Sequence, residues 1–305
     1  MKILMTGGTG LIGQAFIRQF EDHQFTILTR STAPLKPLKK GASAALVVVK
    51  FIQSLKDLKD LNDFDAVINL AGEPIIDKRW SANQKHIICH SRWDLTEQLV
   101  ALFAASEKPP LVFLNGSAIG AYGHRGDQVI TEEVAVEVHN FNTKLCLGWE
   151  QRAMQAVPYT RVVLLRTGIV LAPQGGALGK MLLPFKCFLG GRVGDGRQYM
   201  SWIHYQDHIH AMHYLLLENS LSGPINMVAP EPQTNRVFTQ TLAQSLNRLA
   251  VLPLPKKILE LLLGEAACLL LDSQKIVPHR LLESGFKFKF NSLKAALDNL
   301  LKSTP

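Results

Sequence analysis

Cysteine is scarce in this chain of 305 residues, and the signatures of several protein classes are missing with it. The four cysteines, Cys89, Cys146, Cys187 and Cys268, stand apart, without the CxxC pairing of a zinc or redox site. Their number is also far below the cysteine density of a small secreted scaffold. No basic leader with a cleavage site precedes the first apolar run at residue 2. These absences predict a protein of the reducing cytoplasm that holds no metal.

No hydrophobic run is long enough to cross a membrane. The longest, ILELLLGEAACLLL at 258–271, contains Glu260 and Glu265 and falls short of the roughly 20 residues that a membrane helix needs. We interpret it as a buried helix and expect no membrane partner. The net charge of +8 comes from lysines and arginines interleaved with polar and apolar residues, which favours solvated faces over a nucleic-acid surface.

Short apolar runs rich in β-branched residues alternate with helical stretches along most of the chain. This alternation is typical of a parallel sheet with crossover helices, and the near-continuous hydrophobicity of the runs predicts strands that are covered on both faces. The runs are KILM, FTIL, AALVVV, DAVINLA, PLVFLN, RVVLLR and PINMV. We therefore expect a doubly wound α/β domain.

The rhythm of strands and helices breaks after Val170, where a glycine-rich stretch with no clear strand predicts a small lobe or lid over about 171–200. After PINMV the remainder of the chain is mostly helical in pattern. We expect 1–229 to form a cofactor-binding domain, with the lobe as an excursion, and 230–305 to form a helical C-terminal cap. We expect a monomer or a homodimer that acts on a small-molecule substrate.

The chain opens with MKILMTGGTGLIGQAF, which contains a short strand, a glycine triad and an amphipathic helix. In this context the triad predicts a dinucleotide-binding loop, with an ordinary glycine-rich turn as the alternative. Gly7 permits the tight turn, Gly10 lets the backbone approach a pyrophosphate, and Gly13 allows the helix to pack closely on the strand. The helix N-terminus supplies amide donors and a positive potential to the phosphates.

The residues after the second apolar run indicate which cofactor binds. An NAD-selective site commonly places Asp or Glu here, on the adenosine ribose, whereas this chain has Thr29, Arg30 and Ser31. Arg30 can pair with a 2′-phosphate and stack on adenine, so we predict NADP as the cofactor. An ordinary surface arginine is the alternative.

Further motifs are spread over nearly the whole chain: TGGTGLIG, NLAGEPI, GSAIGAYG, KLCLGWE, LRTGIVLAPQGGALGKML, SWIHYQD and LLESGFKFKF. With them the chain resembles the extended, nucleotide-sugar-epimerase side of the short-chain dehydrogenase/reductase superfamily, and more closely its atypical "epimerase family" proteins. The resemblance implies a Rossmann-like core with a smaller C-terminal substrate lobe, and an NADP(H)-dependent oxidoreductase or epimerase-like activity. The cofactor contacts that it implies are Thr9, Leu11, Ile12, Asn69, Leu70, Ala71, Gly72, Lys144 and Thr167.

The resemblance places Ser117 at the catalytic position, and Ser117 follows the strand LVFLN closely enough to lie beyond its carboxyl end. A structural turn serine is the alternative. The superfamily's acid/base is a tyrosine four residues before a lysine, but Asn140 occupies that position before Lys144. Lys144 can still bind the cofactor. The resemblance places Tyr122 where the extended family has a tyrosine that shapes the substrate pocket, which makes it a candidate for substrate contact. It is also the substitute proton donor, with a packing role as its alternative.

Three charged residues are candidates for substrate contact. Glu73 and Arg79 follow the fourth strand, where contact with substrate and helix packing are equally open. Met200 occupies the position at which extended epimerases often carry an arginine for the sugar diphosphate. Arg197, three residues away, can compensate, but we name no nucleotide sugar.

The segment HYQDHIHAMH contains His204, Asp207, His208 and His210, whose residue types and close spacing resemble those of a metal site. We expect Asp207 to cap the following helix instead, which spreads the histidines around that helix.

Two functions stay open from the sequence. One is the enzyme just described, working without the usual tyrosine. The other is a non-catalytic NADP(H)-binding protein that regulates a partner, since some relatives carry a cell-division-inhibitor label. Asn140 favours the second function, whereas Ser117 and Lys144 favour the first.

Overall fold

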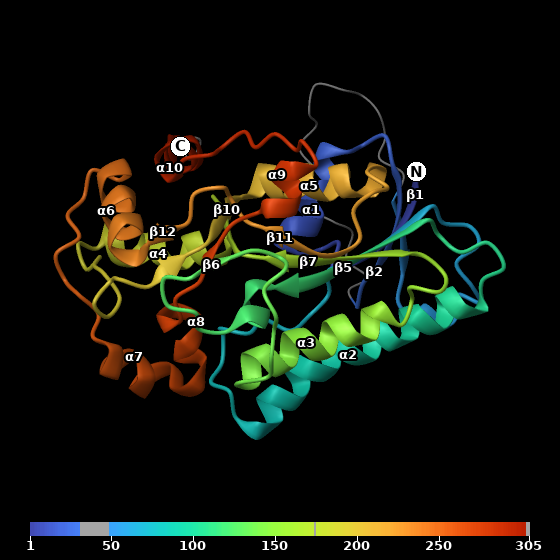
Figure 1. Cartoon of the computed structure of the whole chain (residues 1–305), viewed down its shortest axis with the longest axis horizontal. Helices are drawn as coiled ribbons and strands as arrows, with labels where there is room; N and C mark the ends of the chain where they lie inside the picture. The colour runs from blue at the N-terminus through green and yellow to red at the C-terminus, as the bar shows by residue number, and fades with distance from the viewer. Residues whose placement is uncertain (31–48, 174, 303–305) are drawn as a thin grey trace.

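The computed structural model describes residues 1–30, 49–173 and 175–302. Its centre is a seven-stranded parallel sheet with the order β11-β7-β5-β4-β1-β2-β3 (Figure 1). The strands are β1 (Lys2–Thr6), β2 (Gln24–Leu28), β3 (Val49–Ile52), β4 (Ala66–Asn69), β5 (Val112–Ala118), β7 (Arg161–Thr167) and β11 (Gly223–Met227). Each corresponds to an expected apolar run, although the run at 44–49 lies outside the described residues except for Val49.

Alternate strand residues face two different helix layers, which confirms the doubly wound α/β fold. Ile3 and Met5 pack in one buried cluster with α1 (Leu11–Gln19) and α5 (Tyr205–Leu217). Leu4, between them, joins the cluster on the opposite face, which includes side chains from the helices of that layer. Those helices are α2 (Ala82–Ala105) and α3 (Phe141–Met154), which run side by side along the sheet in Figure 1.

The excursion after β7 and the C-terminal helices share a second core. Trp202, Phe238 and Leu297 are buried together in it, although they come from distant parts of the sequence. Two small sheets accompany this core, pairing β10 with β8 and β12 with β9. The elements around it are β8 (Ile169–Ala172), α4 (Gly176–Lys186), β9 (Tyr199–Met200), β10 (Trp202–His204), β12 (Gln233–Thr234), α6 (Asn235–Ser245) and α10 (Leu293–Lys302). The glycine-rich stretch at 171–198, expected to carry no clear strand, therefore contains the end of β8 and the helix α4, and β9 follows it directly.

The run at 258–271 is not one buried helix, and that expectation was wrong. Gly264 takes a φ of +59°, which ends α7 and starts a tighter turn. Leu261 is 75% exposed, so much of the run faces solvent. Further on, β13 (Lys275–Ile276) pairs in parallel with β6 (Val129–Ile130), a short strand in the segment after β5. The other elements of this C-terminal segment are α7 (Lys256–Leu263), η3 (Gly264–Ala267), α8 (Cys268–Leu271) and α9 (His279–Glu283). A short helix, η1 (Leu55–Asp57), follows β3. Within the described ranges, no helix combines the length and apolar character needed to cross a membrane.

Candidate functional site

The loop between β1 and α1 has the backbone geometry of a phosphate cradle. Gly7 has a φ of +69°, and a Cβ there would stand 2.7 Å from the carbonyl carbon of Leu70. A Cβ at Gly13 would stand 2.5 Å from the Gly7 carbonyl oxygen, so only glycine lets the helix pack this closely. At Gly10, the N-cap of α1, a Cβ would meet only that oxygen, at 3.2 Å. The open space beyond Gly10 fits a pyrophosphate at the helix N-terminus.

A buried hydrogen-bond network fixes the segment that faces this cradle. Asn69, at the end of β4, accepts a hydrogen bond from the Thr6 hydroxyl at 2.6 Å. Its amide donates to Asn115 at 2.7 Å and to Thr96 at 2.9 Å. The N–H of Ala71 donates to Thr6 Oγ1 at 3.2 Å. The network aligns the carboxyl ends of β1, β4 and β5, and it holds the residues after β4 opposite the glycine loop.

The remaining cofactor candidates lie along the same edge of the sheet. Arg30 is exposed just past the end of β2, and the residues that follow it are outside the described ranges. Thr167 ends β7, with its hydroxyl 3.1 Å from Nε2 of His208. Thr9 is exposed, while Leu11 and Ile12, at the start of α1, are half-buried.

The Ser117 hydroxyl faces the helix layer instead of the cleft. Ser117 is 6% exposed and donates to Glu150 Oε1, on α3, at 2.6 Å. Arg166, from β7, binds the same carboxylate through Nε and Nη2, each at 2.8 Å. Burial alone would lower the pKa of Arg166, but the hydrogen bonds and charge of Glu150 raise it. The Ser117 proton is therefore held inside a buried ion-pair cluster, which fits the structural alternative.

Tyr122 ends the short helix η2 (Ile119–Tyr122) and has no exposed surface. Its hydroxyl donates to Asn226 Oδ1 at 2.7 Å, and the Arg166 guanidinium lies 4.7 Å from the ring centre. Burial raises the pKa of the phenol, which makes it a weaker acid. These contacts fit the packing role that the sequence left open.

Asn140 has a structural task at the position of the missing tyrosine. Its side chain accepts from the Thr143 N–H at 3.0 Å, and its own N–H donates to the Thr143 hydroxyl at 3.0 Å. This reciprocal pair is a capping box that starts α3. Lys144 is exposed on the first turn of the same helix. Burial raises the pKa of Cys89, and the charges of Lys144, Arg92 and Arg152 oppose that shift.

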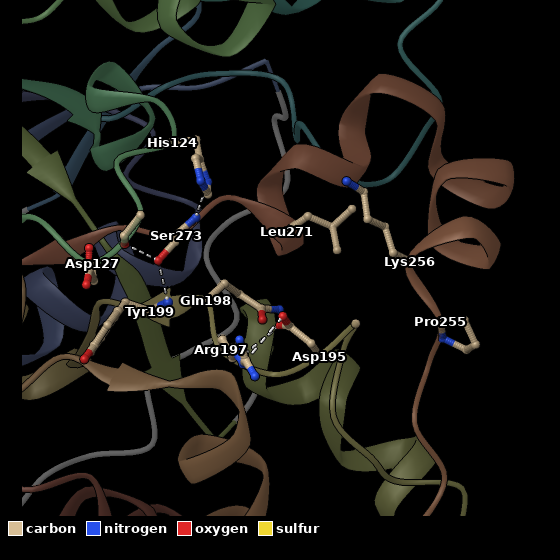
Figure 2. A pocket seen from close by; sticks show the side chains of 12 residues that line it. His124, Asp127, Asp195, Arg197, Gln198, Tyr199, Pro255, Lys256, Leu271 and Ser273 are labelled. Atoms are coloured by element: carbon tan, nitrogen blue, oxygen red, sulfur yellow. Dashed lines mark hydrogen bonds and ion pairs between the residues drawn. The ribbon is translucent and has the colours of Figure 1, made fainter.

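A cavity of about 680 Å³ opens beyond η2, between the loop after β5 and the excursion (Figure 2). Arg197 lies at its wall, exposed and 4.0 Å from Asp195. Other lining residues include His124, Asp127, Tyr199, Lys256, Leu271 and Ser273. The N–H of Ser273 donates to His124 Nδ1 at 3.0 Å, which ties the chain after α8, residues 272–292, here named the C-terminal strap, to the loop after η2.

Glu73 and Arg79 are not among the described residues that line this cavity. Glu73 is half-buried, with a carboxylate oxygen 3.7 Å from Lys78 Nζ. Arg79 lies against the turn that ends α7, since a Cβ at Gly264 would stand 3.3 Å from its Nη2. The structure therefore separates these two candidates from Arg197. Met200 is buried, and its sulfur accepts from Asn235 at 3.2 Å.

The expectation that Asp207 caps α5 was wrong. His204 is the N-cap, its Nδ1 accepting from the Gln206 N–H at 3.1 Å. Asp207 instead accepts from the N–H groups of Lys289 and Phe290, at 2.8 and 2.9 Å. It thereby ties the C-terminal strap to the helix. The described residues contain no group of three or more side chains arranged to hold a metal ion.

Three charged residues beneath the sheet were not predicted from the sequence: Arg92, which is half-buried, and Glu150 and Arg166, which are buried. The signal for Arg166 was available, because an arginine inside a strand buried on both faces requires a partner. The sequence alone could not name that partner, since Glu150 lies on a helix whose rotation only packing determines.

Comparison with known proteins agrees with this geometry. The family model described as the NAD dependent epimerase/dehydratase family matches residues 3–228, and a domain of unknown function, DUF1731, matches residues 254–300. An epimerase family protein of Staphylococcus aureus, MW0731, is 36% identical over 304 residues and covers 99% of both chains. A second such protein, SERP0438 from Staphylococcus epidermidis, is 35% identical over 305 residues with the same coverage.

Solved structures show the same architecture. The human epimerase family protein SDR39U1 (isoform 2), solved with NADPH, is 31% identical with a TM-score of 0.89, covering 99% of this chain and 100% of the other. A nucleoside-diphosphate sugar epimerase from Corynebacterium glutamicum is 28% identical with a TM-score of 0.76, covering 99% of this chain but 58% of its own. The chain belongs to the NAD-dependent epimerase/dehydratase family, as an epimerase family protein that carries the C-terminal DUF1731 domain.

Proposed function

We propose that this protein binds NADP(H) along the glycine loop and catalyses hydride transfer between the nicotinamide and a small-molecule substrate. The observation that carries the proposal is the open space beyond Gly10, opposite the segment after β4. Arg30 stands past the end of β2, and neither Thr29 nor Ser31 brings a carboxylate that would repel a 2′-phosphate. The human relative at 31% identity, solved with NADPH, supports this choice of cofactor.

The protein's own groups have limited tasks in this reaction. Amides at the start of α1 bind the pyrophosphate, Arg30 binds the 2′-phosphate, and Lys144 orients the nicotinamide ribose. Bound NADP(H) supplies or accepts the hydride. Reduction of a carbonyl would also require a proton for its oxygen. Because the hydroxyls of Ser117 and Tyr122 already donate to partners inside the protein, that proton would have to come from another donor, such as water.

Cofactor choice is tested by replacing Arg30 with aspartate. Wild type should bind NADPH roughly ten- to hundredfold more tightly than NADH, because one charge-assisted hydrogen-bonded pair contributes about that much affinity. Arg30→Asp should reverse the preference. Calorimetry gives both dissociation constants. Arg18→Asp, an equal change of charge at an exposed position on α1, is the control and should keep the preference. Equal dissociation constants for the two cofactors in wild type would refute the NADP assignment.

A non-catalytic NADP(H)-binding regulator is the second candidate. The observation that favours it is the structural use of all three groups at the expected acid/base positions: Ser117, Tyr122 and Asn140. A screen of carbonyl compounds with NADPH separates the two candidates. Loss of nicotinamide absorbance that depends on the protein identifies the enzyme, and tight NADPH binding without turnover across the screen identifies the regulator.

A further inference from the structure

The side chain of Arg92, on α2, lies directly against the segment that follows β4. A Cβ at Gly72 would stand 2.5 Å from Cζ of Arg92 and 2.8 Å from both Nε and Nη2. A point this close to Cζ and equally far from the two nitrogens lies over the flat face of the guanidinium, so that face packs on the backbone of Gly72, one of the predicted cofactor residues. Any larger residue at position 72 would displace it.

The guanidinium is held in this orientation by its other side. Its carbon lies 5.3 Å from the ring centre of Trp149 on α3. Nη1 donates to the carbonyl of Ile88 at 3.1 Å and approaches Ser91 Oγ at 3.4 Å. Ser91 Oγ also accepts from the N–H of Glu73 at 3.0 Å, which fixes the same segment from below. Gly72, Trp149 and two oxygens thus hold the guanidinium in place, while its Nε–Nη2 edge, the presented edge, takes part in none of these hydrogen bonds.

The presented edge has no partner within the described part of the chain. Neither Nε nor Nη2 makes a described hydrogen bond, and no described carboxylate lies within 4.0 Å of Arg92. Three other described arginines also lie over aromatic rings. Arg166 pairs with Glu150 and Arg152 with Glu97, whereas Arg248, over Phe188, is exposed to solvent and makes no described ion pair. Burial lowers the pKa of Arg92, and the opposing effects of Cys146, Cys89 and Glu73 do not offset it.

The presented edge is not sealed from solvent and lies beside the predicted cofactor residues. None of the Arg92 nitrogens belongs to the described buried side-chain atoms that lack a hydrogen bond, so this edge keeps contact with solvent. Gly72 follows Leu70, whose backbone touches the glycine loop.

We propose that Arg92 is an anion-binding residue, whose Nε–Nη2 edge binds two oxygens of a carboxylate or phosphate group at the end of β4. A fork of this shape matches either group in bidentate fashion. Two sources carry such oxygens here: the cofactor pyrophosphate, and an acidic group on the substrate. The second source deepens the proposed function, on which it rests, by making the substrate a small carbonyl or hydroxy compound that bears an acid.

The experiment compares Arg92→Met, which keeps the stem, with Arg92→Lys, which keeps the charge but loses the fork. Arg152→Met is the matched control, since Arg152 stacks on Trp93 in the same helix layer and already has a glutamate partner. Calorimetry measures NADPH binding to each variant. Oxalate, as a planar carboxylate probe, and inorganic phosphate are titrated into both cofactor-free and NADPH-saturated protein. Circular dichroism checks the fold of each variant.

Arg92→Met should lose roughly ten- to hundredfold in at least one of these affinities, with Arg92→Lys intermediate and Arg152→Met unchanged. Weaker NADPH binding assigns the edge to the pyrophosphate. Weaker oxalate or phosphate binding at unchanged NADPH affinity assigns it to a substrate acid. Unchanged affinities in folded Arg92→Met and Arg92→Lys would overturn the proposal. Failure of wild type to bind NADPH refutes the proposed function instead, and the cofactor-free titrations then still test Arg92.

Discussion

The glycine loop after β1 and the polar cluster beneath β5 lie near the same edge of the sheet, but they are built from different groups. The loop consists of backbone, carries no titratable side chain and leaves space beyond Gly10. The cluster consists of the side chains of Ser117, Glu150 and Arg166, and it is closed to solvent. Residues two apart in a strand share a face, so Ser117 follows Asn115 toward the helices. Nearness to a strand's carboxyl end therefore does not by itself bring a side chain into the cleft.

The largest effect should come from opening the closed cluster with Glu150→Gln. It leaves the Arg166 charge buried without its counter-ion, which costs about 3–5 kcal/mol of unfolding free energy. Urea unfolding measures the loss. Glu97→Gln, which breaks the exposed pair with Arg152, is the control and should cost less than about 1 kcal/mol. A cost for Glu150→Gln as small as that of the control would show that the cluster contributes little.

Acid should lower the unfolding free energy through two buried histidines, His204 and His208. Burial lowers the pKa of His204 and of His208 to about 4, from 6.5 in the unfolded chain. Between these values the unfolded state binds more protons, so the unfolding free energy falls as pH falls from 6.5 and levels off below about 4. The loss is on the order of 3 kcal/mol for each histidine.

Urea unfolding of wild type and His208→Gln across this pH range measures that effect. The variant should lose less stability on acidification, because one of the two protonation steps has been removed. His90→Gln, at an exposed position, should keep the wild-type slope. Identical slopes in wild type and His208→Gln would contradict the assignment.

On the open side, Gly10→Val should abolish cofactor binding while the fold remains. A branched side chain fills the space that the pyrophosphate needs, so we expect a loss of roughly hundredfold or more in NADPH affinity. Calorimetry measures the affinity, and thermal unfolding checks the fold. Gly179→Ala, at a helical position with nothing within 4 Å of its added Cβ, is the control. If a folded Gly10→Val protein binds NADPH as tightly as wild type does, the loop is an ordinary glycine-rich turn and not a phosphate-binding loop.

The smallest effect should come from Tyr122→Phe. Loss of the hydroxyl leaves Asn226 Oδ1 without its donor, which costs about 1–3 kcal/mol of stability. Turnover on a confirmed substrate should change little, because the hydroxyl proton is held inside the protein. A general acid contributes roughly 10²- to 10⁴-fold, so a fall in turnover of that size at unchanged NADPH affinity would restore Tyr122 as the proton donor.

Much of the predicted cofactor site, the glycine loop with its strand and helix, could be predicted from local sequence. A strand, the glycines and an amphipathic helix follow one another within the first 20 residues, and their conformations depend on neighbours in the chain. The same holds for the hydrophobic runs that form the strands, because a parallel sheet covered on both faces requires near-continuous apolar residues.

The roles of the candidate catalytic and metal-binding side chains depended on contacts that local sequence does not encode. Asp207 bonds to the backbone of residues 82 and 83 positions away, and the Tyr122 hydroxyl meets an asparagine 104 positions away. The sequence by itself determined the fold class, the glycine cradle and the arginine at the end of β2. Only the tertiary structure decided that Ser117 turns inward and that Arg92 lies against Gly72, because helix rotation and strand register are fixed by packing across the whole core.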